Sequence, residues 1–253
     1  MSTLDGGGRI STNDLAIYFN AGNKESYVSG SKICYNLVRN NPLKVGSPAT
    51  TPVKNVSGSL FNGVEFSASN GGTFVFDGTN DYIDFSTHYF PSSGNNVKTT
   101  AIAWFKLTST ATSSNTISIK HPIFGQFEDS AMTGLGVDGG FISMLYFNYP
   151  IFTWTKVQTS ASVADGNWHQ VAFITSTVGY PNNPYWTVYL DGNMVVSQSL
   201  LTGFLSSWLD GLGKDRYGAY FSGSIASTQI YNRELTQIEI IRNYNITKGR
   251  FSL

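Results

Sequence analysis

Short runs of β-forming residues, each closed by turn residues, recur along most of this chain. Such runs, bounded by Gly, Asn, Asp and Pro, are typical of strands in a sandwich or a barrel. With 253 residues the chain is long enough for one large sandwich. The predicted strands cover residues 15–19, 59–66, 73–76, 81–85, 99–107, 122–126, 140–147, 151–157, 169–176, 185–190, 194–198 and 223–231. We therefore predict an all-β fold, a two-sheet antiparallel sandwich over residues 14–253.

Two local motifs add detail to this outline. Asp77-Gly78 lies between two predicted strands, which predicts a hairpin that joins 73–76 to 81–85. Thr236 and Glu239 form a capping box, in which each side chain can bond to the backbone of the other residue. Ile240 and Tyr244 then begin an apolar stripe. The second motif predicts one short C-terminal α-helix of about ten residues, packed on the sandwich.

Residues 1–13 are predicted to be a flexible arm. Gly6, Gly7 and Gly8 bury no side chain and lose more backbone entropy on ordering than other residues. No core-forming pattern begins before Leu15. We expect the domain at 14–253 to fold without the arm, and the arm to become ordered only against a neighbouring subunit.

The composition excludes several classes of partner. Charged residues make up 13% of the chain, and the 16 basic residues balance the 16 acidic ones, so no positive field attracts nucleic acid. No run approaches the roughly 18 apolar residues that span a bilayer, so no membrane insertion is expected. Cys34 is the single cysteine and is predicted to be a small buried residue. The start lacks an apolar signal region, so we expect either a mature fragment or a protein that assembles without secretion.

Five segments, in order along the chain, resemble the laminin-G-like, concanavalin A-like jelly-roll superfamily of lectins and glucanases. They are residues 76–83, 102–105, 165–172, 188–192 and 221–226. The resemblance covers about residues 60–250. It implies a concanavalin A-like jelly-roll sandwich, in which Trp168 is buried and its neighbour His169 has a structural or surface role.

A narrower resemblance concerns the two ends of the chain. Residues 15–27 and 230–245 look like the edges of such domains in virion proteins of tailed bacteriophages. This resemblance implies a non-enzymatic virion structural protein, a capsid decoration, neck or fibre-associated protein. Its partners would be other virion proteins or copies of itself, and it would assemble in the host cytoplasm. It would also display a surface for host or environmental glycans, such as cell-surface polysaccharide. The alternative is a carbohydrate-binding adhesion module of a bacterial surface or secreted protein, at the cell surface or outside the cell.

A glycan hydrolase is the least favoured alternative. Glucanases of this superfamily need two carboxylates on one strand face, in a pattern such as Glu-x-Asp-x-Glu. No such string occurs, and Glu128 and Asp129 are adjacent and would point to opposite faces of a strand. We therefore assign no catalytic residue.

Two aromatic segments are candidates for a glycan site. Sugar sites combine exposed aromatic rings with amide or carboxylate groups that bond to hydroxyls. The candidates are Tyr149 and Trp154 in one segment and Asn182, Asn183 and Tyr185 in the other. The aromatic rings could instead belong to the core or to an interface.

A calcium site is implied by the same resemblance. Laminin-G-like relatives often bind one Ca²⁺ through carboxylates and carbonyls, and Asp77, Asn80 and Asp81 lie close together in one turn. The alternative is that these side chains satisfy the backbone groups of the turn itself.

Overall fold

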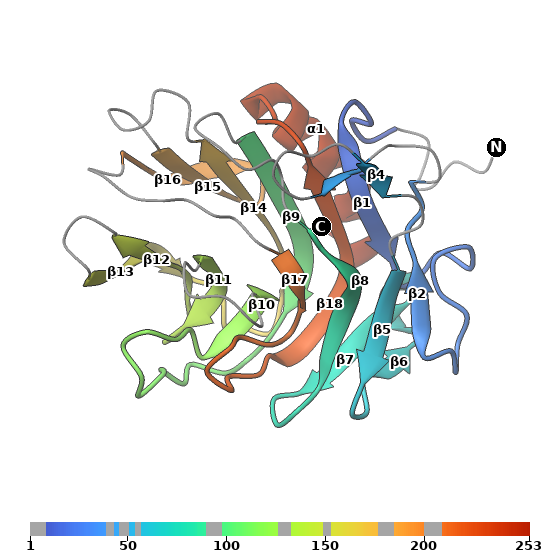
Figure 1. The fold of residues 1–253 in the computed structure, drawn as a ribbon, viewed down its shortest axis with the longest axis horizontal. Coiled ribbons are helices and arrows are strands. Elements are labelled where there is room, and N and C mark those ends of the chain that lie inside the picture. Colours follow the sequence, from blue (N-terminus) through green and yellow to red (C-terminus); the bar gives the residue numbers. More distant parts are fainter. Residues whose placement is uncertain are drawn as a thin grey trace.

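A computed structural model describes residues 9–38, 43–45, 51–53, 57–89, 98–125, 133–148, 153–176, 185–199 and 209–253. Within these residues the chain forms two large antiparallel sheets that face each other, one small sheet and a C-terminal helix (Figure 1). This confirms the predicted two-sheet jelly roll with one short helix.

The first large sheet, here called the helix-side sheet, has eight strands in the order β16-β15-β14-β9-β18-β7-β6, with β1 also paired to β18. Its strands are β1 (Leu15–Asn20), β6 (Glu65–Ser67), β7 (Thr73–Asp77), β9 (Lys98–Lys106), β14 (Trp168–Ser176), β15 (Tyr185–Leu190), β16 (Asn193–Ser199) and β18 (Ser222–Tyr231).

The second large sheet, here called the opposite sheet, has the order β13-β12-β11-β10-β17-β8-β5-β2. Its strands are β2 (Ile33–Tyr35), β5 (Ser57–Phe61), β8 (Tyr82–Tyr89), β10 (His121–Gly125), β11 (Thr133–Asp138), β12 (Phe141–Asn148), β13 (Thr153–Ser162) and β17 (Leu209–Leu212). The small sheet pairs β3 (Leu43–Val45) with β4 (Thr51–Val53). The helical elements are η1 (Ser69–Gly71), α1 (Gln237–Thr247) and η2 (Lys248–Phe251).

The main core lies between the two large sheets. Strand β9 sends Ala101, Ala103 and Phe105 into it, because alternate side chains of a strand point to the same face. Its other face is also buried, so that Trp104 is only 1% exposed. Burial on both faces explains why this strand reads as a nearly continuous apolar run. Cys34 and Trp186 also lie in the core, as predicted.

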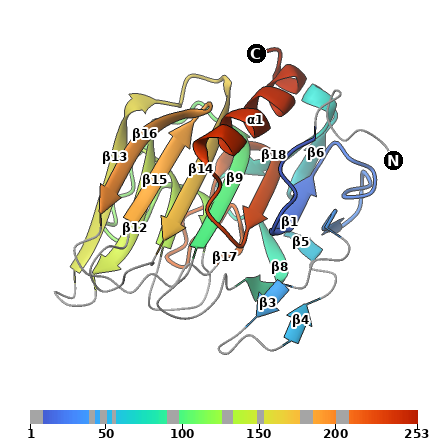
Figure 2. The ribbon, with the colours of Figure 1, turned by 90° about the horizontal axis from the view of Figure 1, so that it is seen from above.

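Helix α1 and the turn η2 cover the outer face of the helix-side sheet (Figure 2). The ring of Trp104 stacks 4.3 Å from the ring of Phe251, and its Nε1 donates to Thr247 Oγ1 at 2.8 Å. The ring of Trp168 lies 4.7 Å from the same Phe251, so this tryptophan is buried, as predicted, but outside the sandwich core. The aromatic rings therefore attach the C-terminus to the sheet.

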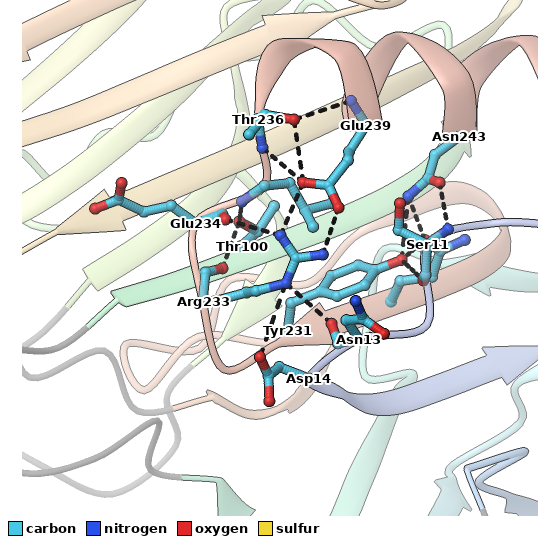
Figure 3. A network of polar contacts seen from close by, with 12 residues as sticks. Ser11, Asn13, Asp14, Thr100, Tyr231, Arg233, Glu234, Thr236, Glu239 and Asn243 are labelled. Atoms are coloured by element: carbon cyan, nitrogen blue, oxygen red, sulfur yellow. Dashed lines mark hydrogen bonds and ion pairs between the residues drawn. The ribbon is translucent and has the colours of Figure 1, made fainter.

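The predicted capping box is present at the start of α1. Glu239 N donates to Thr236 Oγ1 at 3.3 Å, and Thr236 N donates to Glu239 Oε2 at 3.0 Å. The guanidinium of Arg233 also binds this carboxylate and, with the cap, lowers the pKa of Glu239 to about 2 (Figure 3). The helix thus begins with a fully charged, hydrogen-bonded glutamate.

Two turns join different sheets, contrary to the predicted hairpin. Strand β7 pairs with β6 and β18, whereas β8 pairs with β5 and β17, so the Asp77-Gly78 turn crosses from one sheet to the other. The predicted strand 59–66 is likewise two strands, because Asn62 and Gly63 have φ of 62° and 133° and turn the chain between the sheets. The pairing partners of the strands on either side of each turn are therefore set by how the strands pack on the core. The residues of the turn do not set them.

The N-terminal expectation is wrong for residues 9–13, whereas residues 1–8 of the predicted arm lie outside the described residues. Ile10 is 8% exposed and joins the apolar cluster under α1. Ser11 N donates to Asn243 Oδ1 at 2.9 Å, and Ser11 O accepts from the hydroxyl of Tyr231 at 2.9 Å (Figure 3). Asn13 O accepts from Arg233 Nε. These residues belong to the domain because β18 and α1 satisfy their backbone groups.

Candidate functional site

The structure separates the predicted glycan residues. Tyr149, Asn182 and Asn183 lie outside the described residues. Trp154 lies on β13 of the opposite sheet, whereas Tyr185 begins β15 of the helix-side sheet. The two aromatic residues that can be placed therefore belong to different surfaces.

Tyr185 is part of the scaffold. Burial and a hydrogen bond to Glu234 raise the pKa of the Tyr185 phenol, and Ser176 also bonds to it. Glu234 lies 3.7 Å from Lys98 Nζ and belongs to the segment that leads into α1. Tyr185 thus connects β15 to this segment through its hydroxyl group.

Trp154 is paired with an aromatic residue that the sequence did not single out. Val157 packs on the core, so Trp154, three positions earlier, points to the outer face of the opposite sheet. There its ring meets that of Tyr217 edge to face, with centroids 6.5 Å apart and planes at 85°. The guanidinium carbon of Arg216 lies 5.3 Å from the Tyr217 centroid. We call Trp154, Arg216 and Tyr217 the aromatic site.

Polar side chains extend from the aromatic site along β13. Lys156 and Gln158 share the outward face with Trp154, because they are two and four positions further on. Lys156 Nζ lies 2.8 Å from Asp138 Oδ2, and Gln158 Nε2 donates to Asp138 O and to Ser143 Oγ. The Lys156 ammonium is thus a hydrogen-bond donor on the same strand face as the half-buried ring of Trp154.

Tyr217 was missed because its role depends on a loop that crosses the sheet. Residues 213–221 join β17 to β18, and Tyr217 meets Trp154 although β10, β11 and β12 separate β17 from β13 in the sheet. The turn-forming residues Asp215 and Gly218 lie on either side of Tyr217 and predict a turn there. Nothing local indicated which face of the molecule the turn would cover.

A serine–histidine contact lies at the inner face of β10, where His121 pairs with the core residue Val137, but it lacks the third member of a triad. Ser109 Oγ is 2.8 Å from His121 Nε2, and the backbone of Tyr220 also interacts with the imidazole. Burial, aided by Lys120, lowers the pKa of His121 to about 4. In a triad a carboxylate orients the base through its second nitrogen, and no described carboxylate is hydrogen-bonded to His121 Nδ1.

The candidate calcium turn is largely occupied by its own backbone. Asp77 Oδ1 accepts from Thr79 N at 2.7 Å and Asn80 N at 3.3 Å, and Asp81 Oδ2 accepts from Asp77 N at 3.0 Å. Asp81 Oδ1 alone is buried without a partner, and burial raises the pKa of this carboxyl. Ca²⁺ takes about six to eight oxygen ligands. The residues fit a self-capped turn better than a calcium site, and we assign no metal to them.

The described residues contain no group of three or more His, Cys, Asp or Glu side chains arranged to hold a metal ion. None of the described helices is long and apolar enough to cross a membrane.

A two-sheet antiparallel jelly roll with a helix on one sheet defines the class of concanavalin A-like sandwich domains. The family model described as the concanavalin A-like lectin/glucanases superfamily matches residues 77–241, more than half of the chain. The chain belongs to this superfamily. A comparison with curated protein sequences finds no match.

Several solved structures share the fold. Domain 4 of AbnA, an extracellular GH43 arabinanase from Geobacillus stearothermophilus, in complex with arabinotriose, has a TM-score of 0.56 at 17% identity, over 90% of this chain and 97% of that domain. The ligand-binding domain of botulinum neurotoxin serotype D, in complex with N-acetylneuraminic acid, has a TM-score of 0.60 at 13% identity, over 92% of this chain and 50% of that one.

The binding domain of Paraclostridial Mosquitocidal Protein 1 has a TM-score of 0.57 at 13% identity, over 92% of this chain and 52% of that one. The chain spans about half the length of the toxin binding domains that it matches. At these identities the likeness shows the shared fold alone.

Proposed function

We propose that this chain is a glycan-binding module and that the aromatic site holds a sugar ring. The observation that carries the proposal is the contact between Trp154 and Tyr217 on the outer face of the opposite sheet. Aromatic rings offer an apolar surface to the C–H face of a sugar, and nearby donors bond to its hydroxyls. The ammonium of Lys156 and the guanidinium of Arg216 are such donors.

The fold comparisons support a binding role over a catalytic one. Two of the similar structures named above are binding domains, and the third, domain 4 of an arabinanase, was solved in complex with arabinotriose and matches this chain over 97% of its length. That ligand belongs to the arabinanase domain, but it provides a first probe for this chain. Neutral oligosaccharides are suitable probes because stacking on aromatic rings requires no charge.

A glycan array followed by calorimetric titration of the best ligand, with arabinotriose as the first named probe, tests the proposal. We expect Trp154→Ala and Tyr217→Ala each to weaken binding about tenfold or more, since a stacked ring contributes on the order of 1.4 kcal/mol. Tyr35→Ala is the matched control, because Tyr35 is a 54% exposed aromatic residue on β2, at the other edge of the same sheet. Unchanged binding by Trp154→Ala would overturn the proposal.

We also propose that the module is displayed on the particle of a tailed phage, in contact with other virion proteins or with copies of itself. The support is the resemblance of residues 15–27 and 230–245 to the edges of virion domains. Mass spectrometry of purified particles tests the location, and we expect peptides of this chain in them. Their absence from particles, with the chain present at a bacterial surface, would favour the adhesion-module alternative.

A further inference from the structure

Asp215 lies beneath the aromatic site and is 3% exposed. Its Oδ1 accepts from the backbone N–H of Tyr217 and from that of Ala219, both at 2.9 Å. Its Oδ2 accepts from the hydroxyl of Ser118 at 2.5 Å. One carboxylate therefore binds two amides of its own loop together with the Ser118 hydroxyl and the Ile119 amide of the segment that precedes β10.

The loop closes around this carboxylate. Asp215 N donates to Ala219 O at 3.1 Å, and Gly218 has φ of 82°, a conformation that glycine adopts without strain. Tyr217 and Ala219 lie on the two sides of that turn. With the carboxylate removed, both N–H groups lose their acceptor, and the loop loses the contacts that give it one conformation.

The segment that supplies Ser118 is held in a similar way. Asp138 Oδ1 accepts from the N–H groups of Ser113 and Lys120 at 2.7 and 3.2 Å. Because Asp138 also pairs with Lys156 on β13, the Ser118 segment is fixed relative to the strand that carries Trp154. Asp215 thus joins the loop that carries Tyr217 to a surface already fixed on β13.

We propose that Asp215 is the positioning residue of the aromatic site, holding Tyr217 against Trp154 before any ligand binds. This inference rests on the glycan-binding function proposed above. A ring that is already in place loses little conformational entropy when the ligand binds, and affinity rises accordingly. Asp215 itself is buried and does not contact the ligand.

Two readouts on the full chain test the inference: NMR amide exchange at Tyr217 and Ala219, and calorimetric titration with arabinotriose. In Asp215→Ala we expect both amides to exchange about tenfold faster or more, and the affinity to fall about tenfold. In Asp215→Asn we expect a smaller change in both quantities than in Asp215→Ala, because the amide oxygen can accept both loop N–H groups and Nδ2 can donate to Ser118 Oγ, whereas the carboxylate's bond to the Ile119 amide is weakened or lost.

Asp165→Ala is the matched control, because Asp165 Oδ1 also caps a turn, at Asn167 N, but does so beside the helix-side sheet. We expect it to leave both readouts at the aromatic site unchanged. If Asp215→Ala does not fold, Ser118→Ala replaces it, with one hydrogen bond removed and an expected change of about threefold in both readouts.

Protected amides in Asp215→Ala would overturn the inference, and so would faster exchange with unchanged affinity. Loss of affinity in Asp215→Asn equal to that in Asp215→Ala would also overturn it. A wild-type chain that binds neither arabinotriose nor any arrayed glycan overturns the proposed function instead, and amide exchange at Tyr217 still shows whether Asp215 holds the loop.

Discussion

At the scale of single residues, His169 joins two turns through two carboxylates. Its Nδ1 lies 2.7 Å from Asp191 Oδ2 and its Nε2 lies 3.2 Å from Asp165 Oδ1, with the side chain 14% exposed. Burial by itself lowers the pKa of His169, but the two carboxylates outweigh it, and the pKa is raised above 6.5. The sequence predicted a structural or surface role, and these contacts give the residue a structural one.

The raised pKa of His169 predicts how stability depends on pH. A group whose pKa is higher in the folded state stabilises that state fully below its unfolded pKa, about 6.5, and loses this contribution as pH rises through the folded value. We expect the free energy of unfolding, measured in urea at intervals from pH 5 to pH 9, to fall over this window more in wild type than in His169→Gln. Parallel pH profiles for the two proteins would contradict the assignment.

At the scale of elements, the segment 9–14 is a part of the fold that the sequence pattern did not indicate. Ile10 contributes only one apolar side chain, so no periodic run marks it, yet it is buried next to Leu235 and Ile240. Its neighbours bond to β18 and α1 instead of to a strand partner. Helix α1 was predictable because the bonds of its capping box join residues three positions apart.

Two N-terminal deletions distinguish the contribution of residues 2–8 from that of residues 9–13. Removing residues 2–8 is expected to leave the melting temperature of the purified chain nearly unchanged. Removing residues 2–13 is expected to cost about 2 kcal/mol, because the burial of Ile10 and the bonds of Ser11 are lost. Thermal and urea unfolding measure both effects. Equal stability of the two deletion variants would show that residues 9–13 do not stabilise the domain and behave as the predicted arm.

At the scale of the whole molecule, the position of helix α1 determines which outer sheet face can carry a binding site. Helix α1 lies on the outer face of the helix-side sheet (Figure 2). Trp104 and Trp168 of that sheet pack against Phe251 of η2. The opposite sheet has no helix among the described residues and is crossed instead by the segments that carry Ser118 and Tyr217. The aromatic site therefore forms where loops, rather than a helix, meet an outward sheet face.

The sequence by itself determined the class of fold, the positions of most strands, the helix and the burial of Cys34, Trp168 and Trp186, because these depend on local pattern and side-chain polarity. The tertiary structure alone decided that the Asp77-Gly78 turn crosses between sheets and that Trp154 meets Tyr217 rather than Tyr185. These outcomes depend on which distant strands share a sheet. That choice is made by the burial of both inner faces in one core, and no local run of residues encodes it.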